Sequence, residues 1–249
     1  MLDRIEPDSS EPVARRVFRD LRQAIVTMRF RPGQPLSEAE VAKSLGISRQ
    51  PVREAFIKLS EAGLVSIRPQ RGTFVVKISA KQVMDAQFVR QAVELAVVRK
   101  ASQELSAAAI RDLHGIVKQQ RVAAVENPDI FLDLDEAFHR SIALGVGCEY
   151  AWRVVEETKA QMDRVRYLSI PEQATPIERL ITQHEMILEG IQARNPDLAE
   201  SAMRLHMGEI LTSLPDLEKR FPDLFDSDGP APARGEDTTP RRVPVTTKA

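Results

Sequence analysis

Apolar residues recur at helical spacing near the start of the chain. One face of a helix predicted over residues 13–29 carries Val13, Val17, Leu21, Ala24 and Ile25. The segment RPGQPL, rich in helix breakers, ends this pattern and predicts a turn.

Two shorter helices are predicted after this turn, each with a recognisable start and end. Ser37 caps the first helix, with Glu40 three residues later as in a capping box, and Gly46 ends it. Ser48 caps the second helix, which ends at Gly63.

A β-hairpin is predicted next. Two short runs of strand-forming residues, LVSIRP and TFVVKI, flank the segment PQRG, which we interpret as an exposed tip. Three helices followed by such a hairpin form a winged helix-turn-helix, which we place at residues 12–78.

From Ser79 onward the pattern is helical, with no further strand signal. Six helices are predicted there, near residues 80–103, 106–126, 129–145, 149–169, 176–193 and 196–213. The predicted fold class is therefore mostly α, with an N-terminal winged helix-turn-helix followed by an all-α antiparallel helical bundle over residues 79–221. We expect residues 1–11 and residues 222–249 to be disordered, the latter because their end is rich in proline, threonine and charge.

Composition limits the class of protein. The chain has 249 residues, enough for two modest domains, and 43% of them are hydrophobic. A single cysteine, Cys148, excludes an internal disulfide framework. No apolar run is long enough to span a bilayer, and the acidic N-terminal segment does not resemble a signal peptide. We expect a cytoplasmic protein without a membrane partner.

The net charge of -1 hides an asymmetry. Residues 1–78 contain 14 lysines and arginines against 9 acidic residues, a net charge of about +5. The remainder contains 21 against 27, a net charge of about −6. This imbalance favours contact between the N-terminal third and a polyanion, although a solvated basic surface would produce the same imbalance.

The segment LGISRQPVREAF places Arg49, Gln50 and Arg53 at the start of the third helix. A recognition helix inserts its N-terminal residues into the major groove, where arginine can pair with guanine O6 and N7. At the hairpin tip, Arg71 can meet phosphate or the minor groove, and Gly72 lets the backbone approach closely. The alternative is a small basic domain whose arginines only keep it soluble.

The exact amino-acid sequence of this region is more informative than its pattern of predicted helices and strands. The stretch RPGQPLSEAEVAKSLGISRQPVREAFIKLSEAGLVSIRPQRGTFV closely resembles the DNA-binding domain of the GntR family of bacterial regulators. The resemblance implies that DNA is bound by Ser48, Arg49, Gln50, Arg53, Arg71 and Gly72. Some members of the family carry an arginine where Ala39 stands, so a contact from that position is absent here.

Three of the four histidines fall on apolar helix faces, together with one carboxylate. Asp135 and His139 are four residues apart, on a face that also carries Leu132, Ile142 and Val146. His184 and His206 each lie within the apolar stripe of a later helix, and a bundle brings such stripes together. His114 has no such surroundings, and we interpret it as structural.

Three imidazoles and a carboxylate suit a divalent metal ion, most simply zinc, with nickel, cobalt or manganese as alternatives. A metal would satisfy all four groups, whose burial otherwise costs free energy. Two other interpretations stay open. Each histidine could be a neutral core residue that is hydrogen-bonded to a neighbour, and Asp135 with His139 could form a plain ion pair.

The second region also resembles a known domain. The segments FVRQAVELAVVRKAS, LDEAFHRSIALGVG and ITQHEMILEGIQARNPDLAESAMRLH are similar to the FCD domain of the FadR-type branch of the GntR family. The resemblance extends over residues 80 to about 214. It implies a bundle of six or seven helices that binds a metal and a small organic acid.

Two arginines are candidates for binding that acid. Arg90 and Arg166 both project near the apolar face of their helices, and a guanidinium can grip a carboxylate with two hydrogen bonds. Arg90 could instead pair with Glu94, and Arg166 could extend along a helix edge toward water.

We therefore predict a transcription regulator, acting as a repressor, and not an enzyme. The expected partners are a palindromic operator in double-stranded DNA, a second copy of the chain and a small carboxylic acid. The main alternative is a metal-dependent enzyme that uses the three histidines and the aspartate. The segment HEMIL has Leu188 where the zinc-protease motif needs a second histidine, which argues against that class. A second alternative is a metal that only stabilises the bundle.

Overall fold

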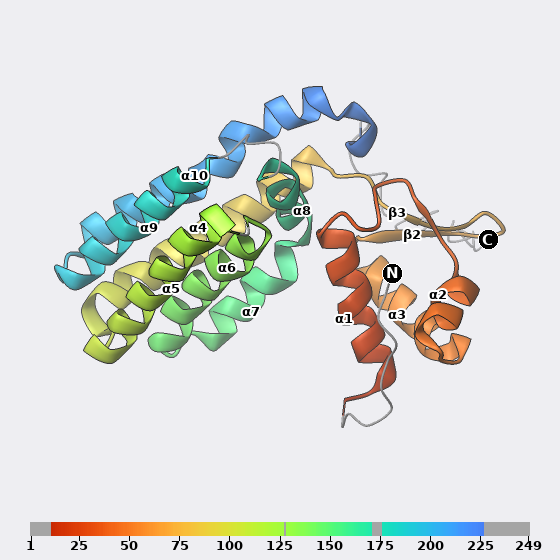
Figure 1. The fold of residues 1–249 in the computed structure, drawn as a ribbon, viewed down its shortest axis with the longest axis horizontal. Helices are drawn as coiled ribbons and strands as arrows, with labels where there is room; N and C mark the ends of the chain where they lie inside the picture. The colour runs from red at the N-terminus through yellow and green to blue at the C-terminus, as the bar shows by residue number, and fades with distance from the viewer. Residues whose placement is uncertain (1–10, 127, 171–175, 227–249) are drawn as a thin grey trace, which may run out of the picture.

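The computed structural model describes residues 11–126, 128–170 and 176–226, which form two helical units joined near Ile78 (Figure 1). The predicted fold class is confirmed: a winged helix-turn-helix precedes an all-α bundle. None of the described helices is both long and apolar enough to cross a membrane.

The N-terminal unit contains three helices and a small antiparallel sheet. Its elements are α1 (Val13–Val26), β1 (Pro35–Leu36), α2 (Glu38–Leu45), α3 (Arg49–Glu61), β2 (Val65–Arg68) and β3 (Gly72–Val75). The strand order is β1-β3-β2. The sequence predicted only a turn where β1 lies, because two residues are too few to show strand periodicity. Pro35 and Leu36 form a strand because they pair with β3.

The predicted helix boundaries depend on local contacts that the structure contains. The Ser37 hydroxyl accepts a hydrogen bond from the backbone N–H of Glu40 at 3.3 Å, so the capping interaction is confirmed. Gly46 ends α2 with a left-handed φ of 70°. Ser48 occupies the position before α3, but its side chain accepts no capping hydrogen bond. Behind these helices, Leu21, Val52 and other apolar side chains form a buried core.

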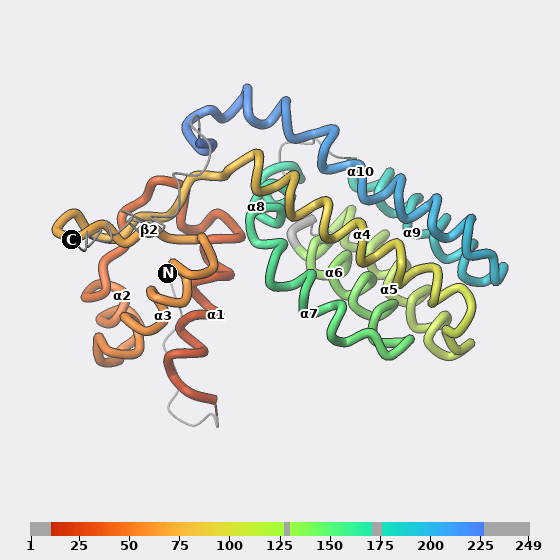
Figure 2. The backbone as a smooth tube through the Cα atoms, turned by 180° about the vertical axis from the view of Figure 1, so that it is seen from behind, coloured from red at the N-terminus to blue at the C-terminus, as the bar shows by residue number. Residues whose placement is uncertain are grey.

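The bundle contains seven described helices. They are α4 (Ala80–Glu104), α5 (Ala107–Glu126), α6 (Pro128–Gly145), α7 (Glu149–Thr158), α8 (Ala160–Ser169), α9 (Ile177–Gln192) and α10 (Pro196–Arg220). Helix α10 packs along both α9 and α4, and α5 packs against α6 and α9 (Figure 2). Helix α8 lies against α1, so it belongs to the bundle and also touches the N-terminal unit (Figure 1).

The prediction of a single helix over residues 149–169 is wrong, because the structure contains two helices there, α7 and α8, which meet at Lys159. The Lys159 ammonium is buried and pairs with Glu136 at 2.5 Å and with Asp163 at 2.7 Å. The next residue, Ala160, packs into the core of the N-terminal unit. These tertiary contacts cannot be seen in a local helical pattern.

The predicted end of the last helix at residue 213 is also wrong. Helix α10 continues through Pro215 to Arg220. Its final turns pack into a third apolar cluster, which we call the junction cluster: Ile78, Val83, Ala86, Met162, Val165, Leu214, Leu217 and Phe225. Burial of Leu214 and Leu217 there offsets the hydrogen bond that the proline removes.

Residues 222–226, expected in the disordered tail, are ordered. Pro222–Leu224 form a 3-10 helix, and Phe225 is buried beside Ile78. The backbone N–H of Ile78 donates to the carbonyl of Leu224 at 2.9 Å, and that of Asp226 donates to the carbonyl of Ile78 at 2.8 Å. The apolar Phe225 gives this segment a buried anchor that the polar composition of the tail conceals. Residues 1–10 and 227–249, also expected to be disordered, lie outside the described residues.

Helices α9 and α10 approach closely at Gly190, where an added Cβ would lie 2.5 Å from the backbone nitrogen of Ala199. We expect G190A to lower the free energy of unfolding by about 1–3 kcal/mol, because the helices must separate. The matched control is G115A in α5, where nothing lies within 4 Å of an added Cβ. G115A should raise stability by about 0.5–1 kcal/mol. Urea denaturation measures both, and equal effects of the two variants would contradict the close approach.

Candidate metal centre and DNA-reading surface

The structure brings together the four side chains predicted to bind a metal. Asp135 and His139 come from α6, His184 from α9 and His206 from α10, and all four are buried. Their ligand atoms lie within 4.8 Å of one another. Helical spacing places the first two on one face, and packing of α9 and α10 against α6 adds the others.

The distances between the donor atoms fit a single ion. Nε2 of His206 lies 3.0 Å from Nε2 of His139 and 3.3 Å from Nε2 of His184. Oδ1 of Asp135 lies 3.4 Å from His184 Nε2 and 3.7 Å from His206 Nε2. Donors about 2.1 Å from one ion lie roughly 3.0–3.4 Å apart for octahedral to tetrahedral angles. Small adjustments would therefore complete a coordination shell.

Oxygens of an outer layer face Nδ1 of all three imidazole rings, and they form hydrogen bonds with the rings of His184 and His206. Each ring presents Nδ1 to an oxygen outside the centre: Glu94 Oε2 at 2.5 Å from His139, Gln120 Oε1 at 2.8 Å from His184 and Gln183 Oε1 at 3.2 Å from His206. An acceptor at Nδ1 favours the tautomer that carries its proton there, which leaves the Nε2 lone pair facing the centre. Paired in this way, metal-binding histidines have a fixed ring orientation.

Gln120 and Gln183 belong to this site but were not predicted from the sequence. Both amides are buried, Gln120 completely. The available signal was weak: Gln120 lies on the apolar face of its helix, three residues after Val117, and Gln183 immediately precedes His184. A buried amide has many possible partners, so its position alone does not reveal a histidine.

One oxygen of the cluster lacks a hydrogen bond. Oδ1 of Asp135 is fully enclosed and accepts none within the described part of the chain. Burial of an unsatisfied carboxylate oxygen is costly, so a cation at the centre suits this atom. The donor set of three nitrogens and one oxygen is of the kind that zinc and similar divalent ions accept.

The electrostatics keep the ligands in their metal-binding forms. Burial raises the pKa of Asp135, but the Arg166 guanidinium and the nearby His184 and His139 outweigh burial and hold that pKa well below its usual range. Burial lowers the pKa of His184 and, with the help of neighbouring His184, lowers that of His206 strongly. At neutral pH the carboxylate is therefore ionised and these two imidazoles are neutral, as metal binding requires.

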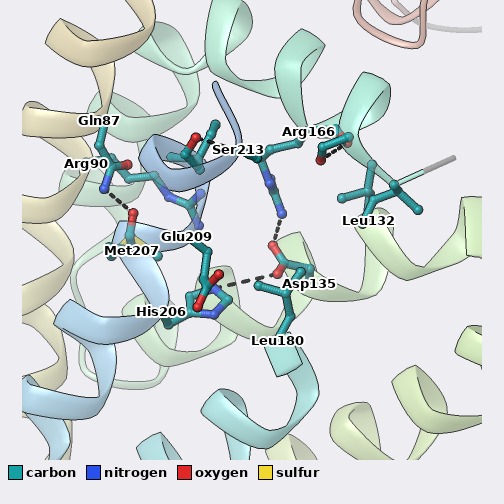
Figure 3. Close-up of a pocket in the computed structure, with 13 residues that line it drawn as sticks. Gln87, Arg90, Leu132, Asp135, Arg166, Leu180, His206, Met207, Glu209 and Ser213 are labelled. Carbon is teal, nitrogen blue, oxygen red and sulfur yellow. Dashed lines mark hydrogen bonds and ion pairs between the residues drawn. The ribbon is translucent and has the colours of Figure 1, made fainter. Parts of the chain in front are cut away.

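A cavity adjoins this centre (Figure 3). It contains about 430 Å³ of empty space, partly open to solvent, and its wall includes Asp135 and His206. Both predicted acid-binding arginines, Arg90 and Arg166, line it. The other polar lining residues were not predicted from the sequence: Gln87, Ser169, Glu209 and Ser213. Two serines, one glutamine and one of many glutamates form no distinctive pattern along the chain.

Neither arginine is unpaired. Nε of Arg90 lies 2.5 Å from Glu94 Oε1, so the ion pair considered as an alternative is present, inside the cavity wall. Arg166 does not extend toward water: it pairs with Asp135 and lies 3.3 Å from Asp163 (Figure 3 shows the pair with Asp135). Each guanidinium has five N–H groups, so donors remain for a ligand in the cavity.

The predicted DNA-reading residues lie at the surface of the N-terminal unit. Arg49, Gln50 and Arg53 are exposed at the start of α3, with Ser48 directly before them. At the hairpin tip Arg71 is exposed, and Gly72 has a φ of 97° that only glycine adopts easily. The fold thus leaves all six side chains or backbone positions accessible.

Helix α8 joins the bundle to the N-terminal unit through polar contacts that the sequence analysis missed. Nε2 of Gln161 donates to the carbonyl of Gly63 at 3.1 Å, and Nη2 of Arg164 donates to the carbonyl of Val76 at 2.7 Å. Arg164 is completely buried, and burial lowers its pKa to about 10. Its other hydrogen bond goes to Gln161 Oε1 at 3.0 Å, so neutral oxygens hold this cation.

Comparison with known proteins identifies the class. Residues 13–75 match the bacterial regulatory proteins of the gntR family, and residues 85–209 match the FCD domain. The chain belongs to the gntR family of DNA-binding transcription regulators and carries an FCD domain at its C-terminal side. These families consist of regulators, in agreement with the prediction that the protein is not an enzyme.

Individual relatives agree over nearly the whole length. The chain is 42% identical over 217 residues to the HTH-type transcriptional repressor RspR of Escherichia coli K12, covering 87% of this chain and 95% of that protein. It is 36% identical over 217 residues to an uncharacterized HTH-type regulator of Streptomyces ambofaciens, covering 86% and 90%. The solved structure of E. coli McbR/YncC has a TM-score of 0.70 at 19% identity over 85% of this chain and 99% of that one, and it supports the fold alone.

Proposed function

We propose that this protein is a transcriptional repressor whose operator affinity is controlled by a small carboxylic acid bound beside a divalent metal ion. The observation that carries this proposal is the convergence of three histidines and Asp135 beside a cavity whose wall includes Asp135, His206 and two arginines. The names of two relatives, the repressor RspR and the gluconate operon repressor of Bacillus subtilis, support repression.

The metal would be held by Asp135, His139, His184 and His206, with zinc as the first candidate. When bound, it would supply positive charge at the cavity wall, where it attracts an acid oxygen. The buried imidazoles of His184 and His206 suit a permanent site because their Nδ1 atoms already have hydrogen-bond partners.

The cavity fits a small acid in its chemistry. Arg166 and Arg90 offer charged donors for a carboxylate, while Leu132, Ile170 and Leu180 offer apolar contacts for a short carbon skeleton. Sugar acids, hydroxy acids, dicarboxylates and aromatic acids all have this chemistry.

On the DNA side, we assign base recognition to Arg49, Gln50 and Arg53, supported by Ser48 at the helix start. The wing, with Arg71 and Gly72, would contact the backbone or the minor groove. One recognition helix covers only a few base pairs, so the functional unit is a homodimer on a palindromic operator.

Helix α8 is the proposed route from the acid to the DNA. It carries Arg166 at the cavity and, two residues earlier, Arg164 at the carbonyl of Val76. Gln161 on the same helix holds Gly63, the residue at which the chain leaves α3. A small shift of α8 on acid binding is therefore felt at the base of the recognition helix, and acid-bound protein would favour an arrangement that fits the operator less well.

The DNA assignment is tested by R53A, with R111A on the exposed face of α5 as a control for lost charge. Selection and sequencing of genomic fragments bound by the protein supplies the operator. We expect R53A to weaken operator binding about 10- to 100-fold, because a bidentate arginine–guanine pair is lost. R111A should bind normally in the same electrophoretic mobility assay. Equal affinity of R53A and the unmodified protein would remove Arg53 from the interface.

The metal assignment is tested by H184A, with H114A as a matched control. His114 lies on the exposed side of α5, away from the cluster. After saturation with zinc and removal of the excess, H184A should retain much less than one zinc per chain by elemental analysis, and H114A should match the unmodified protein. A chelator should lower the melting temperature of H114A, since a metal that binds only the folded state stabilises it. Full occupancy in H184A would contradict the ligand set.

The coupling is tested by Q161A, which removes one contact of α8 with the N-terminal unit. A panel of the four acid classes is first screened with the unmodified protein for compounds that raise the melting temperature and release the operator. In Q161A the active acid should raise the melting temperature as before and release the operator less. Unchanged release would show that the signal does not depend on this contact.

A further inference from the structure

A single carboxylate lies between the two arginines assigned to base recognition. Glu38 is the first residue of α2, and its Oε2 lies 3.3 Å from Arg49 Nη2 and 3.3 Å from Arg53 Nη2. Its other oxygen accepts a hydrogen bond from Arg53 Nε at 3.4 Å. Glu38 thus contacts both guanidinium groups, and it accepts hydrogen bonds from two N–H groups of Arg53.

The two arginines would be poorly placed without this carboxylate. They are four residues apart on α3, so their positive charges face each other on one side of the helix. Arg49 is also the first residue of α3, where the helix dipole disfavours a cation. A negative charge between them offsets both effects and restricts two long, flexible side chains.

Folding stability does not explain this arrangement. The side chains of Arg49 and Arg53 are 64% and 57% exposed, and ion pairs at such positions contribute little to the stability of a protein. General attraction to DNA does not explain it either, because a carboxylate beside the phosphates opposes binding. What the contacts do provide is a defined direction for two guanidinium groups.

We propose that Glu38 is a positioning residue for base recognition: it holds Arg49 and Arg53 in the orientation in which they read base edges, and so raises the preference for the operator over other DNA. The proposal rests on the assignment of these arginines to base reading. Preorganised side chains lose less conformational entropy when they bind, and this gain applies only where the bases match.

The carboxylate stays charged under the conditions of binding. Partial burial raises the pKa of Glu38, but hydrogen bonds from Arg53 and Arg49 outweigh it, and the pKa lies below its ordinary value. Glu38 therefore stays ionised at neutral pH and can hold both cations.

The chain offers a matched control on the same helix. Glu40 is exposed two residues further along α2 and has the same charge, but its carboxylate contacts neither arginine. E40Q therefore reports the loss of one negative charge near the DNA. E38Q reports that same loss together with weakened arginine contacts, and E38A removes those contacts completely.

The experiment measures the dissociation constants of E38Q, E38A and E40Q for the selected operator and for unrelated DNA of equal length, at several salt concentrations. We expect the ratio of operator to non-operator affinity to fall about tenfold in E38Q and further in E38A. In E40Q the ratio should stay unchanged. Non-operator DNA should bind E38Q at least as tightly as the unmodified protein, with the same salt dependence, because no phosphate contact is lost.

Two results would overturn the proposal. An unchanged ratio in E38A, in a protein with a normal melting temperature, would show that Glu38 does not position the arginines. Tighter operator binding by E38Q than by E40Q would show that Glu38 instead holds them away from the bases. The R53A variant distinguishes failure of this proposal from failure of the assignment of Arg49 and Arg53 to base reading. If R53A also binds the operator with normal affinity, the base-reading assignment itself is wrong.

Discussion

The buried carboxylate of Asp135 is the constraint on which much of this structure depends. It lies in the apolar interior of the bundle, so the surrounding chain must supply positive charge to compensate it. Arg166 does so from α8, and Asp163 in turn pairs with both Arg166 and Lys159. Lys159 stands where α7 gives way to α8. The charge of one candidate metal ligand is thus connected, through a short chain of ion pairs, to the point at which the bundle turns toward the DNA-binding unit.

Helix α8 contacts the cavity, the N-terminal unit and the junction cluster, and this explains why so many of its buried residues are polar or charged. One side carries Arg166 to the cavity, a second carries Gln161 and Arg164 to the carbonyls of the N-terminal unit, and a third packs Met162 and Val165 into the junction cluster. A ten-residue helix with so little exposed surface cannot move on one side alone. Allosteric coupling requires an element whose position both sites influence, and under the proposed function α8 would be that element.

The sequence predicted the features that depend on local pattern and missed those that depend on tertiary contact. Three inward histidines and Asp135 were recognisable because imidazoles are rare on apolar helix faces, and the bundle had to bring those faces together. The partners of the imidazoles at Nδ1 could not be recognised in the sequence, because the position of a glutamine such as Gln120 does not indicate which side chain it will contact. The break at Lys159 and the helical path through Pro215 likewise follow from burial against distant residues. The contact of Glu38 with two arginines joins positions 11 and 15 residues apart, across two helices, and no local rule reveals it.

The ordered end of the chain closes the bundle onto its own beginning. Phe225 forms a β-bridge with Ile78, which lies two residues before the start of α4. The first and last described residues of the bundle therefore lie side by side. A protein fused directly after Asp226 would therefore begin beside the junction between the two units, rather than at the far tip of the helices. A circular permutant of the bundle could join its two neighbouring ends, near Ile78 and Phe225, through a short linker. Its new termini would lie in a turn between two helices far from this point.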